Sequence, residues 1–275
     1  MRGSLLLALG CAAAFAGEVV FSRAGEAHRA MEVYSVSSPA APAVIVVPET
    51  AGLGPARYCA RLLQHAGYCV LVLPPAESDH PAAVEEVERA VRFARHGARK
   101  LGIDSRRIAL FGVGSGGLAA SLCGVRKSGP LANARDAADR QSARVRAVVA
   151  LGAYSDLRNE KPRGWVAGLL ARYAEQNGLV SRSLDEGLAR DASPVMHITG
   201  EEPPFFLIHG DADEVTPMVQ STHLQQALKA ANVRCDLLLI PNGRHDMRTW
   251  TSQPRWEDEL VEWLDAAVER KSKKR

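Results

Sequence analysis

Short apolar segments alternate with segments of helical periodicity along most of this 275-residue chain. Val44 to Val47 and Cys69 to Leu73 are apolar at every position, as expected of strands buried on both faces of a parallel sheet. Between them, the residues from about Pro55 to Ala66 follow a helical period that Gly67 ends. The pattern continues with predicted helices at His80 to Lys100, Met218 to Ala231 and Trp256 to Val268, and predicted strands at Ile108 to Phe111, Val145 to Leu151, Phe205 to His209 and Leu237 to Ile240. This alternation predicts an α/β fold with a doubly wound, mostly parallel sheet of about eight strands flanked by helices.

Two stretches interrupt the alternation. Arg126 to Arg144 is polar and is interpreted as an exposed excursion. Ser155 to Ser193 follows a predicted strand end and carries two amphipathic segments, around Trp165 to Ala174 and Leu184 to Ala189. Residues 155–193 are therefore a candidate cap over a pocket, with a plain long connection as the alternative. Before the first buried strand, two short alternating segments predict an edge hairpin, at Val19 to Ser22 and Ala30 to Tyr34.

The N-terminus has the pattern of a secretory signal peptide. Arg2 precedes an apolar run from Leu5 to Phe15, and Ala14-Phe15-Ala16 supplies the small residues of a cleavage site. The run is shorter than the roughly 20 residues that span a bilayer, so a permanent anchor is the weaker alternative and no stable membrane span is expected. We therefore expect residues 1–16 to be removed and residues 17–275 to form a single domain of a secreted or periplasmic protein.

Composition narrows the classes of partner. With 47% hydrophobic and 24% charged residues, the chain can bury the core of one α/β domain. Much of the small net charge of +3 lies in the C-terminal tail, and basic residues are not interleaved with aromatic ones, so no nucleic-acid partner is predicted. The cysteines beyond the signal segment stand singly in apolar segments, without the spacing of metal ligands. No metal, other cofactor or disulfide is predicted, and composition leaves the oligomeric state open.

The segment from Arg107 to Leu122 is central to the candidate chemistry. It is an apolar run that ends in several glycines and continues as a helix, which is typical of a strand, a sharp turn and a helix. Such a turn forces a residue to positive φ and brings backbone against backbone, which glycine tolerates. In the pattern Gly-x-Ser-x-Gly, a turn of this kind presents a nucleophile beside a helix N-terminus. The alternative is a turn that binds nothing, and the missing Lys-Ser/Thr disfavours a phosphate loop.

Two alignments of this pattern place different residues at the nucleophile position. If Gly112 and Gly116 are the flanking glycines, the nucleophile position holds Gly114, which has no side chain. If Ser115 is the nucleophile, Val113 takes a flanking position where close packing favours Gly or Ala. The first alignment is preferred, and the second stays open.

Two loops that follow later predicted strands supply a candidate acid and a candidate base. His245 lies in a glycine-containing loop, where its imidazole can reach the turn while an acid holds the other ring nitrogen. Asp213 is the preferred acid, whereas Asp211 is expected to cap its own turn and Asp246 is a further alternative. His209, at a strand end, is interpreted as structural. We expect Asp213 and His245 to lie within hydrogen-bond distance.

Several strings are similar to those of one known group of enzymes: His80 to Glu85, Gly102 to Ile108, Ala192 to Pro194, Pro203 to Asp213, Gln220-Ser221 and Pro241 to His245. On these strings, the chain from about Ala43 to Met247 resembles the α/β-hydrolase superfamily, specifically the esterase branch that includes dienelactone-hydrolase-like proteins and bacterial acetyl- and feruloyl-esterase-like proteins. This resemblance implies Asp213 as the acid and His245 as the base of a Ser-His-Asp-type site. It also implies a small-molecule carboxylic ester, such as an acetylated carbohydrate, as the ligand.

The loop after the first buried strand departs from the common esterase pattern. The resemblance implies a His-Gly-Gly-type loop, whereas this chain has Pro48 to Gly54. Glu49, with a Gly-Leu pair further along, instead resembles the dienelactone-hydrolase loop, in which a Glu near the nucleophile takes part. The proline has no N–H, so backbone N–H groups near Thr50 and Gly116 are the expected donors to an oxyanion.

These residues support three hypotheses. In the first, Ser115 attacks an ester carbonyl, His245 is the general base and Asp213 orients it, as in a serine esterase. In the second, the protein is a non-catalytic binding member of the fold that keeps the pocket, acid and base, with Gly114 at the nucleophile position. In the third, Glu49 or a water activated by His245 hydrolyses an ester without a covalent intermediate.

Overall fold

The structure, a computed structural model, describes most of the chain. The predicted signal peptide and the helix expected around Trp165 to Ala174 lie outside the described residues, so the signal peptide and most of the candidate cap stay predictions. Within the described part, no helix is both long enough and apolar enough to cross a membrane. The described residues are 17–24, 27–76, 82–126, 128–158, 186–247, 250 and 255–269.

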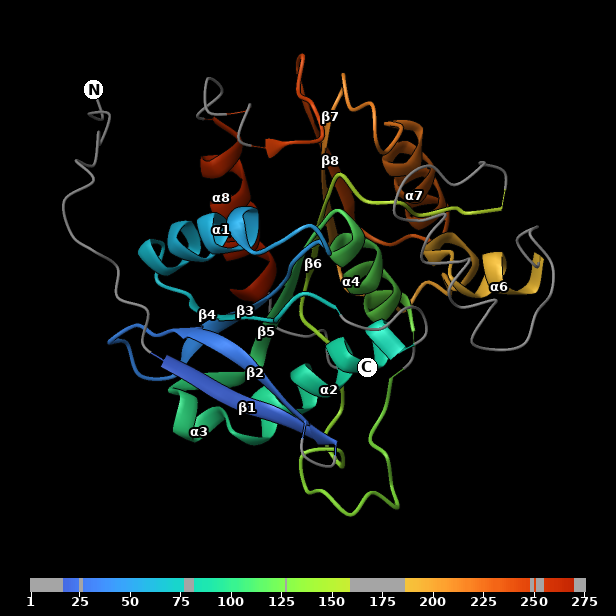
Figure 1. The fold of residues 1–275 in the computed structure, drawn as a ribbon. Helices are drawn as coiled ribbons and strands as arrows, with labels where there is room; N and C mark the ends of the chain where they lie inside the picture. Colours follow the sequence, from blue (N-terminus) through green and yellow to red (C-terminus); the bar gives the residue numbers. More distant parts are fainter. Residues whose placement is uncertain are drawn as a thin grey trace, which may run out of the picture.

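The central layer is an eight-stranded sheet with the strand order β1-β2-β4-β3-β5-β6-β7-β8 (Figure 1). β1 pairs with β2, and β2 with β4, in antiparallel fashion, whereas all other neighbours are parallel. The predicted mostly parallel sheet and its edge hairpin are therefore confirmed. The strands are β1 (Gly17–Ala24), β2 (Ala27–Tyr34), β3 (Ala41–Val47), β4 (Cys69–Val72), β5 (Ile103–Val113), β6 (Val148–Leu151), β7 (Phe205–Gly210) and β8 (Cys235–Ile240).

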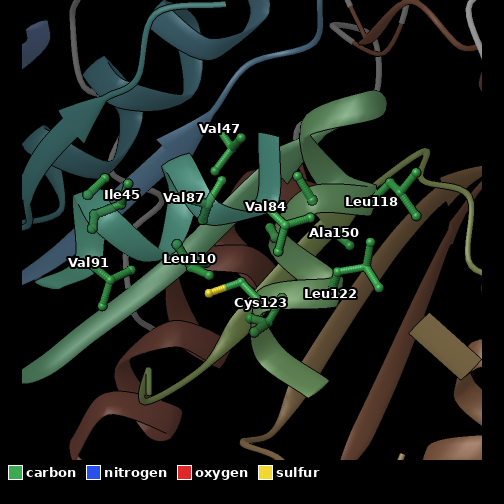
Figure 2. Packing of buried hydrophobic residues seen from close by; sticks show 14 of the residues in the cluster. Ile45, Val47, Val84, Val87, Val91, Leu110, Leu118, Leu122, Cys123 and Ala150 are labelled. Atoms are coloured by element: carbon green, nitrogen blue, oxygen red, sulfur yellow. The ribbon is translucent and has the colours of Figure 1, made fainter. Parts of the chain in front are cut away.

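Helices cover both faces of this sheet. α1 and α8 pack on one face, and α2, α4 and α7 pack on the other (Figure 1). Successive strand side chains enter the two cores in turn, so that Val44 and Val46 face α1 and α8, whereas Ile45 packs with α2 and α4 (Figure 2). The helices are α1 (Gly54–His65), α2 (Ala82–His96), α3 (Ala98–Leu101), α4 (Ser115–Val125), α6 (Glu186–Asp191), the 3-10 helix η1 (Pro194–Met196), α7 (Val219–Ala230) and α8 (Arg255–Glu269).

The helix expected from His80 to Lys100 is two helices, α2 and α3, which meet at Gly97. Gly97 donates its N–H to the carbonyl of Phe93, and a Cβ on Gly97 would lie 3.3 Å from that oxygen. Gly102, at φ 70°, then ends α3 and leads into β5. The helical period of apolar residues continues across Gly97, so this period alone predicts one helix where the structure has two.

Two polar regions are more ordered than their composition suggested. β5 begins at Ile103 rather than Ile108, because its first half is a polar edge where Arg107 pairs with Asp104 and Glu269. The polar stretch from Arg126 to Arg144 is held against α2, where Arg89 forms ion pairs with two of its aspartates, Asp136 and Asp139. Polarity in both regions reflects ion pairing at the protein surface.

Candidate functional site

The turn between β5 and α4 has its strained residue at Gly114, with φ 53° and ψ −116°. An ideal Cβ on Gly112 would lie 2.3 Å from the carbonyl oxygen of Gly116, and one on Gly116 would lie 2.1 Å from that of Val47. These separations are far below van der Waals contact, so both positions require glycine. Close packing at Gly112 and Gly116, with positive φ at Gly114, agrees with the first of the two alignments.

Position 114 faces the candidate base and a carboxylate. A Cβ on Gly114 would lie 3.6 Å from Nε2 of His245, 3.0 Å from Oε2 of Glu49 and 3.3 Å from Cβ of Glu49. A side chain at this position would therefore point between the imidazole and the carboxylate. Gly114 leaves that space to them.

Ser115 is the first residue of α4. Its hydroxyl oxygen accepts a hydrogen bond from the backbone N–H of Thr50 at 3.0 Å. Thr50 N–H is one of the donors expected for an oxyanion, so in this structure the Ser115 hydroxyl occupies it. The two candidate nucleophile positions thus have different surroundings. Position 114 faces His245, whereas the side chain at position 115 faces the loop after β3.

The acid and base expected from the sequence are in contact. Nδ1–H of His245 donates to Oδ2 of Asp213 at 2.8 Å, which confirms the predicted hydrogen-bond distance. The other carboxylate oxygen of Asp213 accepts the backbone N–H groups of Val215 and Thr216, each at 2.8 Å. The Asp213 side chain is fully buried. Three hydrogen bonds therefore fix this carboxylate and aim one oxygen at the imidazole.

Backbone packing brings the two loops together. A Cβ on Gly210 would lie 2.1 Å from the carbonyl oxygen of Gly243, and that carbonyl accepts the N–H of Ala212 at 3.0 Å. Asp211 accepts the N–H of Asn242 at 2.6 Å, so it links the loop after β7 to the loop after β8. This is a wider role than the local turn cap expected of Asp211.

His209 lies behind Asp213 and is fully buried. Its Nε2–H donates to the carbonyl of Thr216 at 2.9 Å, which leaves Nδ1 to accept the hydroxyl of Ser221 at 2.7 Å. Burial lowers the pKa of His209. A neutral imidazole that accepts and donates hydrogen bonds behind the loop carrying Asp213 agrees with the structural role predicted for His209.

His245 is a cation near neutral pH. Burial lowers the pKa of His245, but the hydrogen bond to Asp213 and the nearby carboxylate of Glu49 raise it more, to about 9. Oε2 of Glu49 lies 3.7 Å from Nε2, so this is an ion pair rather than a hydrogen bond. One imidazolium thus stands between two carboxylates.

We predict that the His245 ring titrates near pH 9 and that Glu49→Gln shifts this midpoint to lower pH, because it removes one of the two flanking charges. A raised pKa also stabilises the folded state below about pH 6.5, the ordinary value, and this stabilisation is lost as pH rises through about 9. Ring NMR of the natural protein and of Glu49→Gln measures both midpoints. A midpoint near 6.5 in the natural protein would contradict the prediction.

The sequence interpretation missed Gly152, which follows β6 with φ 57°. A Cβ there would lie 3.5 Å from Oδ2 of Asp213 and 3.5 Å from Nδ1 of His245. These are ordinary van der Waals distances, so the positive φ rather than lack of space favours glycine beside the acid–base contact. A glycine directly after a buried strand was the available signal, since functional residues gather at these strand ends.

The cysteines of the described residues do not replace the nucleophile. All four are free and buried. Burial raises the pKa of the Cys69 thiol to about 11 and that of Cys235 to about 12, and it raises the pKa of Cys59 and Cys123 as well. Thiols protonated in this way are weak nucleophiles.

Two cavities differ in their relation to this site. The larger, of about 770 Å³, lies at the other end of the sheet, between the C-terminal end of α4 and the segments that lead into β6, β7 and β8. A small apolar cavity of about 40 Å³ lies between α2, α4 and the end of β3, and Ser115 and Thr50 line it. The small cavity is the one beside the candidate site, because Ser115 and Thr50 follow Gly114 and Glu49 directly in the chain, although Gly114, Glu49 and His245 do not line it themselves.

Comparison with protein-family models assigns the chain to a family. The BD-FAE family model matches residues 63–228, more than half of the chain. The chain belongs to the BD-FAE family. The matched region contains Gly114, Ser115 and Asp213, whereas Glu49 and His245 lie outside it.

Relatives of this BD-FAE protein are esterases by name. It is 30% identical over 170 residues to Esterase LipC of Mycobacterium tuberculosis, covering 60% of this chain and 41% of LipC. It is 29% identical over 168 residues to Esterase LipQ of the same organism, covering 60% of this chain and 38% of LipQ. The BD-FAE protein thus spans about two fifths of the length of these relatives.

Solved structures show the same fold. An acetyl ester-xyloside bifunctional hydrolase from Caldicellulosiruptor lactoaceticus has a TM-score of 0.75 at 23% identity, covering 91% of this chain and 96% of that chain. A carbohydrate esterase from gut microbiota has a TM-score of 0.77 at 20% identity, covering 94% and 99%. The BD-FAE protein therefore has the α/β-hydrolase fold of these structures.

Proposed function

We propose that this protein binds a carboxylic ester in an esterase-type site and does not form an acyl-enzyme on a serine. The observation that carries the proposal is Gly114, whose Cβ position lies 3.6 Å from Nε2 of His245. A nucleophile must stand within hydrogen-bond reach of its base, and the residue facing this base has no side chain.

Two further features support the absence of a seryl intermediate. A general base must be unprotonated, whereas the two flanking carboxylates raise the pKa of His245 to about 9, after burial has lowered it. A nucleophilic hydroxyl must turn toward its base, whereas the hydroxyl of Ser115 accepts the N–H of Thr50 in this structure. Each feature weakens a different part of the serine mechanism.

The small cavity supports a short acyl group. One water molecule needs about 10–15 Å³ of cavity volume. The small cavity, of about 40 Å³, therefore suits a group of a few heavy atoms such as acetyl. The acetyl ester and carbohydrate esterase activities in the names of the structural neighbours point to the same class. We therefore propose an acetylated carbohydrate as the ligand.

The competing function is a serine esterase with Ser115 as nucleophile and Asp213 and His245 as its partners. The observation that favours it is the place of the Ser115 hydroxyl, beside Thr50 and the small cavity. It requires the turn to rearrange so that position 115 faces His245.

The test combines binding with one substitution. Adding xylose tetraacetate should shift the ring resonances of His245, whereas methyl β-xyloside, which lacks acetyl groups, should not. Ser115→Ala should change the hydrolysis of 4-nitrophenyl acetate by less than about twofold relative to Ser105→Ala, a matched control in the polar half of β5. Loss of most activity in Ser115→Ala alone would establish the serine esterase instead.

A further inference from the structure

We propose that Glu49 and His245 form an acid–base pair that hydrolyses the bound ester by direct attack of water. The inference rests on the proposed function, because it requires an ester to bind beside position 114. It adds an activity to that function and assigns Glu49 the role of general base and His245 the role of general acid.

The geometry leaves a place for the attacking water. Oε2 of Glu49 and Nε2 of His245 are 3.7 Å apart, so a single water can contact both at once. Gly114 puts no side chain against this pair, since even its Cβ position would lie 3.0 Å from Oε2 and 3.6 Å from Nε2. The two side chains are 21% and 19% exposed, so water reaches them from solvent.

The two groups carry opposite protonation roles. Glu49 presents a carboxylate oxygen, a hydrogen-bond acceptor, 3.7 Å from Nε2 of His245. Asp213 fixes the proton on Nδ1 of His245, so a protonated ring directs its second N–H, on Nε2, toward the reaction space. Near neutral pH this ring holds that proton, because its pKa is about 9. A general base next to a general acid suits hydrolysis by water without a covalent enzyme intermediate.

Backbone donors for the developing oxyanion are present at the start of α4. The first N–H groups of a helix have no acceptor within the helix, and the N-terminus carries partial positive charge. In α4 these are the N–H groups of Ser115 and Gly116, next to Gly114. They can stabilise an oxyanion even while Thr50 N–H donates to the Ser115 hydroxyl.

The reaction balances with water as the only co-reactant. The water oxygen bonds to the carbonyl carbon while one water proton passes to the Glu49 carboxylate. The bond between the carbonyl carbon and the alcohol oxygen then breaks, and that oxygen takes the proton from Nε2 of His245. The products are a carboxylic acid and an alcohol. The proton on Glu49 returns to Nε2 through the bridging water position and restores the pair.

The charged and titratable groups around His245 come from three segments. Glu49 lies in the loop after β3, Asp213 lies in the loop after β7, and His209, in β7 itself, lies 3.5 Å from Asp213. His209 is buried and neutral, since burial lowers its pKa. The pH dependence of His245 therefore reports mainly its two carboxylate neighbours.

The experiment measures kcat/KM for ethyl acetate from pH 6 to 10, with the uncatalysed hydrolysis subtracted. Ethyl acetate has a poor leaving group, so it needs the general acid. Glu49→Gln should lose roughly 100-fold or more with little change in KM, as expected for loss of general-base catalysis. Glu49→Asp, which withdraws the carboxylate, should lose less. Glu214→Gln is the matched control, because this exposed Glu directly follows Asp213 in the same loop and its carboxylate faces Arg244.

The direction of the pH profile separates the mechanisms. The rate of the natural protein should fall above about pH 9, because His245 must keep its proton. A serine mechanism predicts the opposite, a rate that rises as the imidazole loses its proton. A rising profile, full activity in Glu49→Gln, or no turnover in a protein that still binds xylose tetraacetate would each overturn the acid–base pair. Failure to bind xylose tetraacetate would instead refute the proposed function.

Discussion

Replacing Gly114 with serine is expected to raise the hydrolysis of 4-nitrophenyl acetate by about tenfold or more, with the roughly 100- to 10,000-fold that a positioned general base supplies as the upper range. The new Oγ would extend from a point 3.6 Å from Nε2 of His245, so it can reach the imidazole. Asp213 already orients that ring. The substitution therefore supplies the missing member of a Ser-His-Asp site.

Two features limit the gain. The new Cβ would lie 3.0 Å from Oε2 of Glu49, so this side chain must move by a few tenths of an ångström. A side chain at φ 53° also costs roughly 1–3 kcal/mol of stability, which the present glycine avoids.

Adding Glu49→Gln to Gly114→Ser lowers the pKa of His245 and should increase the gain in hydrolysis further, since the imidazole then loses its proton more readily.

The matched control for this experiment is Gly114→Ala, which has the same backbone strain and the same Cβ but no hydroxyl. Ester hydrolysis is measured for both variants and for the natural protein, with thermal unfolding to compare their stabilities. Equal activity in the serine and alanine variants would contradict the assignment of position 114 to the nucleophile.

Gly116→Ala is expected to destabilise the fold by about 3 kcal/mol or more. Its Cβ would lie 2.1 Å from the carbonyl oxygen of Val47 and 2.5 Å from that of Pro48. These are backbone atoms, one at the end of β3, and they cannot rotate away as a side chain would. Relief therefore requires α4 to move away from the sheet.

Thermal unfolding measures this effect as a fall in midpoint of roughly 10 °C. Gly54→Ala is the control, because a Cβ on this first residue of α1 has no atom within 4 Å. An unchanged midpoint in Gly116→Ala would show that the packing of this turn is looser than the structure indicates.

The sheet could be predicted because its strands are buried on both faces. Val44 to Val47 and Cys69 to Leu73 are apolar at every position, and β3 and β4 are buried along almost their whole length. The polar half of β5 and the break at Gly97 were missed. Ion pairs stabilise the polar half of β5, and a single glycine separates α2 from α3. Neither ion pairs nor one glycine change the period of the apolar residues, from which the elements were predicted.

The candidate site was predictable in part. Asp213 and His245 follow consecutive strands of the chain, so sheet topology brings them to the same edge. The role of Gly152 and the distance between Glu49 and His245 depend on how loops pack against one another. Such packing arises between segments far apart in the sequence, which local patterns do not record.

The contact between Gly210 and Gly243 has a consequence for motion. A Cβ on Gly210 would lie 2.1 Å from the Gly243 carbonyl oxygen, so the two backbones touch with no side chain between them. Asp213 and His245, 32 positions apart, are thus carried on loops that cannot shift independently. The entropy lost in aligning the acid with the imidazole is lost once, on folding, and is not lost again each time a ligand arrives.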